Sequence, residues 1–132
     1  MSFNTEKEKA IVRALIQRSK EGKTITYKEL SQLDGVNTHW RGFGKPLEVI
    51  GKTCKKKEVN MPLLPSLVVR VDTHLPGEGF YLAFAKDKNL VDKQTKKVFV
   101  KKNQKRVFNY KEWDEALKRY LDYLANNEEG KK

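Results

Sequence analysis

The apolar residues of this chain come in periodic blocks separated by glycine, proline and one Asp-Gly pair, which predicts a folded chain whose elements are joined by turns. The spacing of the first block matches one helical face over residues 4–20, and Gly22 follows it as a C-terminal stop. Thr-x-x-Glu pairs, the pattern of a capping box, stand at Thr5–Glu8 and at Thr26–Glu29. We therefore expect a first helix over residues 4–20 and a short second helix over residues 27–33.

Two further helices are expected before the pattern changes. The block over residues 36–43 predicts a third short helix, which Gly44 interrupts. Pro46 suits the first turn of a fourth helix, expected over residues 46–57. Its spacing places three residues on one face, namely Leu47, Ile50 and Cys54.

The next segment has the pattern of strands. Residues 67–71 are rich in β-branched side chains, residues 75–79 have turn composition and residues 80–84 are apolar again, which predicts a β-hairpin. Three helices followed by a hairpin is the element order of a winged helix. The predicted fold class is therefore α+β: a winged helix (helix-turn-helix plus β-hairpin) with an extra basic strand or loop and a C-terminal helix. We expect one domain, 1–132, whose winged-helix core spans residues 5–85.

The C-terminal third holds a cationic segment and a helix. Residues 86–108 carry one apolar trio, Val98–Val100, among many lysines, and we expect a basic strand or a loop there. The apolar residues that follow recur at helical spacing. With Asn109 and Glu112 as a cap pair, they predict a C-terminal helix over residues 109–126.

Charge and cysteine content limit the possible partners and sites. The 132 residues include 28 Lys and Arg against 17 Asp and Glu, a formal net charge of +11. Lysine and arginine release counterions when they neutralise phosphates, so a basic domain has a salt-sensitive route to nucleic acid. No apolar run approaches the roughly 18 residues of a membrane span, and residues 1–9 lack a signal-peptide core, so we expect a cytoplasmic protein. A single cysteine, Cys54, excludes an internal disulfide and a zinc finger.

The candidate binding residues gather around the expected recognition helix. The segment 37–43 carries side chains that can contact base edges, stack or intercalate, although Trp40 is equally compatible with a core position. Lysines of the fourth helix are placed to contact phosphates, and Gly77 marks the turn of the expected wing. The candidate DNA-binding residues are Tyr27, Asn37, His39, Trp40, Arg41, Lys45, Lys52, Lys55, Lys56 and Gly77.

Four of the sequence motifs carry a resemblance to a known family. They are Thr26–Leu30, Arg41 six residues after Gly35, Pro62–Val69 and Gly77–Tyr81. With these motifs, roughly half of the chain resembles the DNA-binding domain of the alkylguanine-DNA alkyltransferases and their alkyltransferase-like relatives. The resemblance implies that Arg41 acts as a finger that enters the duplex while a base swings out.

The same resemblance implies that the chain does not transfer alkyl groups. Ser66 stands where the family has its reactive cysteine, and Leu67-Val68 replaces the His-Arg that would activate it. Suicidal alkyl transfer needs a thiolate with a base beside it. Neither His39 nor His74 has a sequence-level reason to lie beside Ser66 and make it a nucleophile.

Three functional hypotheses follow from the sequence. The first is a non-enzymatic DNA-binding protein of alkyltransferase-like winged-helix type that contacts duplex DNA without cofactor or metal. The second is a small phage or mobile-element interaction module that binds an acidic protein partner through the same basic surface. The third is a small DNA-processing enzyme, which needs a metal or catalytic cluster. Asp72, His74 and Glu78 are the nearest approach to one, but such groups are common around turns.

Overall fold

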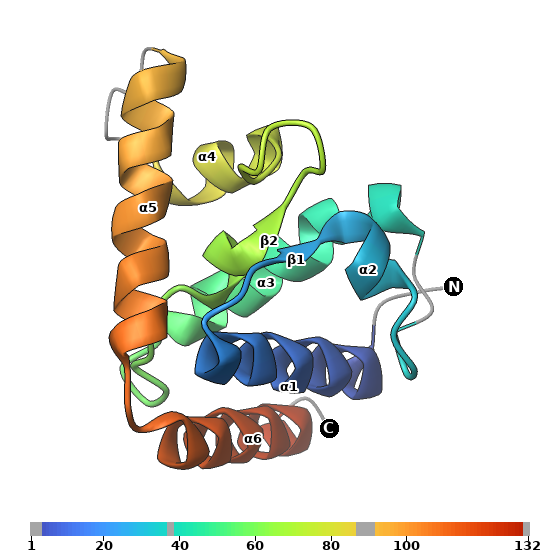
Figure 1. Cartoon of the computed structure of the whole chain (residues 1–132). Coiled ribbons are helices and arrows are strands. Elements are labelled where there is room, and N and C mark those ends of the chain that lie inside the picture. The colour runs from blue at the N-terminus through green and yellow to red at the C-terminus, as the bar shows by residue number, and fades with distance from the viewer. Residues whose placement is uncertain (1–3, 37–38, 87–91, 131–132) are drawn as a thin grey trace.

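The computed structural model describes residues 4–36, 39–86 and 92–130, and this part of the chain is mainly helical (Figure 1). None of its helices is both long enough and apolar enough to cross a bilayer. Two of the short elements, η1 and η2, are 3-10 helices. The elements follow in the order α1 (Thr5–Glu21), β1 (Ile25–Thr26), α2 (Tyr27–Ser31), η1 (Trp40–Phe43), α3 (Gly44–Cys54), η2 (Leu64–Leu67), β2 (Val68–Val69), α4 (Glu78–Phe84), α5 (Lys93–Asn109) and α6 (Trp113–Gly130).

The sheet of the described residues consists of β1 and β2, which pair in parallel. Ile25 lies opposite Val68 and Thr26 lies opposite Val69. The predicted β-hairpin is therefore wrong, and the winged-helix fold class is wrong with it. The segment 67–71 pairs with the strand that precedes α2, and the expected second strand lies in α4 instead.

Aromatic packing explains why residues 80–84 form a helix. Phe80, Tyr81 and Phe84 recur at a spacing that suits one helical face as well as a short strand. In α4 the rings of Phe80 and Tyr81 lie 5.6 Å apart and those of Phe80 and Phe84 lie 5.4 Å apart. These rings and Val100 of α5 belong to a second, smaller hydrophobic cluster. In a strand Tyr81 would lie on the opposite face from Phe80 and Phe84, and these two residues would be about 13 Å apart along the strand.

The segment expected as a basic strand or loop is largely the helix α5. Its N-terminus is closed by a capping box, in which Asp92 Oδ1 accepts from the Thr95 N–H at 2.8 Å and Thr95 Oγ1 accepts from the Asp92 N–H at 3.2 Å. Its buried residues are few: Val100, Gln104 and Val107. Because many lysines surround these three residues, their helical spacing is not recognisable in the hydrophobic pattern of the sequence.

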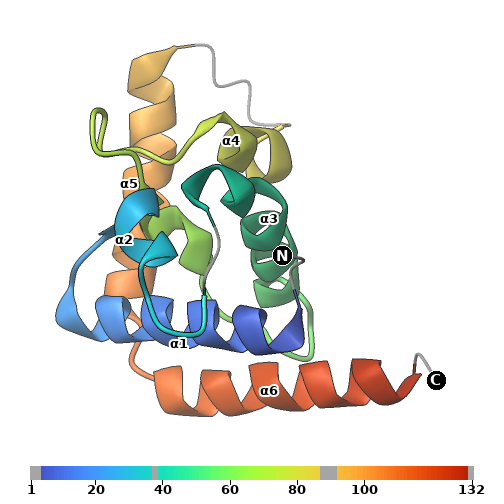
Figure 2. The same cartoon turned by 90° about the vertical axis from the view of Figure 1, so that its right-hand side faces the viewer.

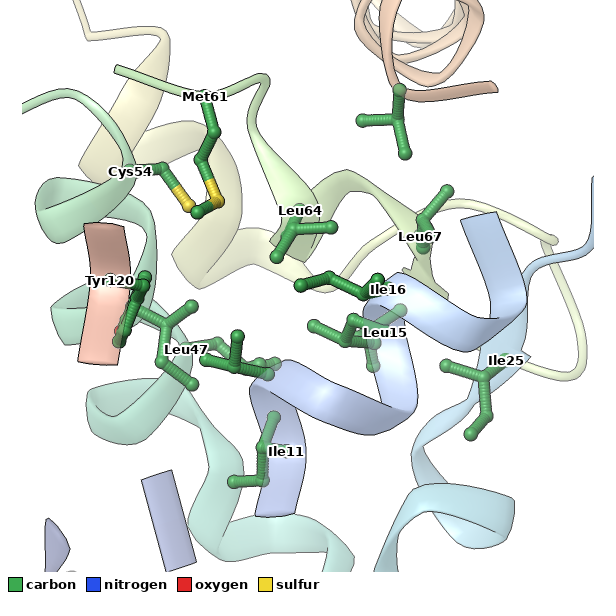
Figure 3. Packing of buried hydrophobic residues seen from close by; sticks show 14 of the residues in the cluster. Ile11, Leu15, Ile16, Ile25, Leu47, Cys54, Met61, Leu64, Leu67 and Tyr120 are labelled. Atoms are coloured by element: carbon green, nitrogen blue, oxygen red, sulfur yellow. The ribbon is translucent and has the colours of Figure 1, made fainter. Parts of the chain in front are cut away.

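The main core surrounds α1 (Figure 3). Ile11, Leu15 and Ile16 of α1 face Leu47 of α3 and residues of η2 on one side of the helix. Figures 1 and 2 both show α6 alongside α1 on its other side. Tyr120 of α6 is fully buried, and its hydroxyl donates to Glu8 Oε2 at 2.6 Å. The C-terminal helix is thus part of the core.

The helix ends test the capping predictions. The Thr26–Glu29 capping box is present, and Gly22 ends α1 with a left-handed φ of 70°. The Thr5–Glu8 box is wrong by one residue, because the side chain of Asn4 caps α1. Asn109 does not cap the C-terminal helix. It is the last residue of α5, and α6 begins at Trp113.

Candidate functional site

A cavity of about 730 Å³ lies between α2, α3, η2, the loop after β2 and α4. Its apolar wall is formed by Leu47, Pro65, Phe80 and Phe84, and Val71 lies exposed at its edge. Polar side chains complete the lining: Tyr27, Lys28, Glu48, Arg70 and Asp72. Ligand pockets are typically about 300–1,000 Å³, mainly apolar, with a few polar groups that orient the ligand. The cavity has these properties.

Tyr27 and Gly77 both line this cavity and contact each other. The capping box of Thr26 places Tyr27 at the start of α2, directly after the strand that pairs with β2. The Tyr27 hydroxyl accepts a hydrogen bond of 2.9 Å from the Gly77 N–H, at the N-cap of α4. Burial raises the pKa of Tyr27 above its ordinary value, although the bond to Gly77 acts in the opposite direction. The bond connects α2 to the N-cap of α4 within the cavity lining.

Charged pairs line the mouth of the cavity. Arg70 Nε and Nη2 donate to the two oxygens of the Asp72 carboxylate at 3.0 and 2.9 Å. This bidentate contact raises the pKa of Arg70 and lowers that of Asp72. Glu48 contacts Lys52 at 2.7 Å and Lys45 at 3.9 Å, and its pKa is lowered, chiefly by the hydrogen bond from Lys52. Both signs of charge are therefore available to a polar ligand.

The α4 wall of the cavity is packed directly against α3. Gly51 of α3 faces the tip of the Phe84 ring so closely that a Cβ there would lie 2.1 Å from Phe84 Cζ. On its other side the Phe84 ring is tilted by 59° against Phe80. Lys55 Nζ lies 5.5 Å from the centre of the Phe84 ring, within the range of a cation–π contact. A glycine in α3 thus allows α4 to approach and close the cavity.

The structure brings together some of the predicted binding residues. Tyr27 and Gly77 line the cavity, and Lys45 follows Gly44 of its lining. Lys52 and Lys55 do not line the cavity but contact two residues that do, Glu48 and Phe84, whereas Lys56 is exposed beyond the end of α3.

The expected recognition helix over residues 36–43 is shorter than predicted. Its described helical part is the 3-10 turn η1, Trp40–Phe43. His39 is exposed before it. Asn37 and the side chains of Trp40 and Arg41 lie outside the described residues.

Several residues that line the cavity were not predicted from the sequence. Phe80 and Phe84 were assigned to a strand, so their shared face was not recognised. Lys28 and Arg70 were not named as binding residues, although Lys28 belongs to the Thr26–Leu30 motif and Arg70 directly follows the Pro62–Val69 motif. Their proximity depends on the parallel pairing of β1 with β2, for which the sequence carries no local signal.

The candidate nucleophiles and metal ligands do not form a reactive site. Burial raises the pKa of the Cys54 thiol to about 12. Ser66 is fully buried, its Oγ has no hydrogen-bond partner among the described residues, and it is not part of the cavity lining. Asp72 pairs with Arg70, and Glu78 with Lys96 at 3.1 Å. Within the described ranges no three His, Cys, Asp or Glu residues lie close enough together to hold a metal ion.

Comparisons with known proteins add no assignment. No protein-family model matches the chain, and no curated protein or solved structure matches it. The resemblance to the alkyltransferases therefore rests on the motif residues alone.

Proposed function

We propose that this protein binds duplex DNA without catalysing a reaction on it, and that the cavity between α2, α3 and α4 receives a base that has left the helical stack. The observation that carries the proposal is the cavity itself. It joins Tyr27 and Gly77, which belong to two separate motifs of the resemblance, and it adjoins η1, where Arg41 stands.

The lining of the cavity suits a nucleobase. Proteins that hold an extruded base place it between aromatic or apolar side chains and contact its polar edge with hydrogen bonds. Here Leu47, Phe80 and Phe84 supply apolar contact, and Lys28 and the Arg70–Asp72 pair supply donors and acceptors. The volume of about 730 Å³ exceeds that of one base, so a flanking sugar or phosphate also has room.

The charge of this face supports contact with DNA. Lys45 is exposed in the first turn of α3, Lys28 lines the cavity, and Arg41 precedes α3 in the chain. Cations around a pocket anchor the phosphates on either side of the base, and they fix its register without reading sequence. A base that is mispaired leaves the stack at the lowest cost. We therefore expect mismatched duplexes to bind more tightly than matched ones.

The chemistry of the nearby nucleophiles favours binding over catalysis. Alkyl transfer needs a thiolate that reaches the ligand. Cys54 is buried with a pKa near 12, and Ser66 is enclosed in the core. The cavity instead provides apolar and polar side chains that can bind a ligand without reacting with it.

The experiment is an anisotropy titration of a labelled duplex, matched or with one central mismatch, at about 50 and about 200 mM salt. We expect the wild-type protein to prefer the mismatched duplex and Arg41→Ala to weaken binding by about tenfold or more. Lys23→Ala is the control, because Lys23 is exposed in the loop between α1 and β1 and does not line the cavity.

Two results would contradict the proposal. Equal affinity of wild type and Arg41→Ala at both salt concentrations removes Arg41 from the binding site. A wild-type protein that ignores duplex DNA at about 50 mM salt is not a DNA-binding protein, and the acidic protein partner then becomes the better hypothesis.

A further inference from the structure

Helix α5 concentrates the positive charge of the molecule. The chain as a whole carries +11, and the 17 residues of α5 carry seven cationic side chains and no carboxylate. The seven are Lys93, Lys96, Lys97, Lys101, Lys102, Lys105 and Arg106.

One face of α5 is fixed to the body of the protein. Val100 and Val107 are fully buried, the Gln104 side chain donates to the Ser66 carbonyl at 2.8 Å, and Ser19 Oγ donates to the Val107 carbonyl at 2.9 Å. The helix surface away from these residues is exposed to solvent. The exposed cations after the first turn are Lys97, Lys101, Lys102, Lys105 and Arg106, and the surface that carries these five is called the outward face.

The protein does not neutralise this face. Within the described residues, the ion pair of α5 is Lys96 with Glu78, and the five outward cations have no carboxylate within 4.0 Å. Like charges four residues apart destabilise a helix, and the sequence places them at 93 and 97, 97 and 101, 101 and 105, and 102 and 106. Cations in the first turns also oppose the helix dipole. A bound polyanion relieves this repulsion.

The shape of the face favours a phosphate backbone as the polyanion. The core of a protein–protein interface is typically depleted in charged residues, and a helix that lies in a membrane interface buries an apolar face. The outward side of α5 offers one exposed large apolar residue among the described ones, Val98, and no residue of α5 lines the cavity between α2, α3 and α4. The outward cations span residues 97–106, about 14 Å along the helix axis, which is long enough to contact successive phosphates.

This face lies apart from the cavity. Figure 1 shows α5 along one side of the molecule and α2 on the other. Figure 2, seen from the right-hand side of Figure 1, shows α5 behind α2. We propose that the outward face of α5 binds the backbone of a second duplex segment, distinct from the segment at the cavity, so that one molecule can bridge two segments. This proposal rests on the proposed function for the first segment.

The test is a bridging assay with two short duplexes, one biotinylated on beads and one fluorescent in solution. We expect wild-type protein to retain the fluorescent duplex on the beads at about 50 mM salt. Binding through three lysines weakens about 40-fold between about 50 and about 200 mM salt, so retention should be lost at the higher concentration.

The decisive variant is Lys97→Gln/Lys101→Gln/Lys105→Gln. Its matched control removes the same charge from exposed lysines outside α5: Lys23→Gln/Lys111→Gln/Lys118→Gln. Circular dichroism checks that both variants are folded. We expect the α5 variant to lose bridging at least tenfold while its anisotropy titration still shows one duplex bound, and the control to bridge as the wild type does.

Three outcomes overturn the proposal. Bridging that survives the α5 variant points to a dimer that uses two cavities. An equal loss in both triple variants shows that total charge matters and α5 does not. A wild-type protein that binds one duplex but never retains a second one contradicts the proposal that α5 binds a second duplex segment. Failure of the proposed function gives a different pattern. If the cavity does not bind DNA, Arg41→Ala leaves duplex binding unchanged, whereas the α5 variant abolishes duplex binding.

Discussion

The contact between Gly51 of α3 and Phe84 of α4 sets the distance between two walls of the cavity, and it can be tested by adding one methyl group. In Gly51→Ala the new Cβ would lie 2.1 Å from Phe84 Cζ, 2.6 Å from Cε1 and 2.9 Å from Cε2. Ordinary contact begins at 3.4 Å, so the ring must move by more than 1 Å. The ring is almost fully buried and packed against Phe80, and it cannot move freely.

Two effects of opposite sign decide the stability of Gly51→Ala. Forcing a methyl group into a packed core costs about 1–3 kcal/mol, whereas replacing a helical glycine by alanine gains about 1 kcal/mol. We expect the variant to be destabilised by up to about 2 kcal/mol. In a Phe84→Leu background the tip of the ring is absent, so the same substitution should stabilise the protein by about 1 kcal/mol. The change of sign is the prediction.

The assay is urea unfolding of the two single variants and the double variant, followed by circular dichroism. The coupling energy of this cycle should be about 1–3 kcal/mol. Gly44→Ala is the matched control in the same helix, because no heavy atom outside its local backbone lies within 4 Å of a Cβ built there. If Gly51→Ala stabilises both backgrounds equally, α3 and α4 do not pack as described.

Two further predictions concern single polar groups. Tyr27→Phe leaves the Gly77 N–H without its acceptor and should lower the free energy of unfolding by about 1 kcal/mol. Tyr123→Phe, which removes a hydroxyl from half-buried Tyr123 of α6, is the control, and equal effects of the two would refute this role of the bond. For Cys54, the raised folded pKa of about 12 against an ordinary value of 9.0 means that stability is unaffected below pH 9 and falls as pH rises toward 12. The stability advantage of wild type over Cys54→Ala should therefore shrink by about 2 kcal/mol between pH 8 and pH 10.5 in urea titrations, and a constant difference would contradict it.

Features with a local cause were predictable. Helix α1, the capping box at Thr26–Glu29 and the stop at Gly22 depend on side chains within a few residues of each other. The shared face of Leu47, Ile50 and Cys54 in α3 is buried as expected. Of the candidate site, Tyr27 and Gly77 were identified as motif residues, although their direct hydrogen bond was not foreseen.

The errors lie where the sequence supports two local structures. The trio of Phe80, Tyr81 and Phe84 is compatible with a strand or a helix, and packing against Gly51 and Val100 selects the helix. In α5 the lysines dominate the pattern, and a narrow buried face is enough to hold the helix on the body. Local propensity is a weak prior that tertiary burial overrides.

The sequence by itself determined the excess of positive charge, the N-terminal and C-terminal helices and the capping of α2, because each follows from composition or from residues near in the chain. Only the tertiary structure decided that β2 pairs in parallel with β1, that α4 closes a cavity over Tyr27, and that the lysines of α5 share an outward face. These outcomes depend on which surfaces bury each other across long separations in the chain. Burial of that kind has no signature within a single segment.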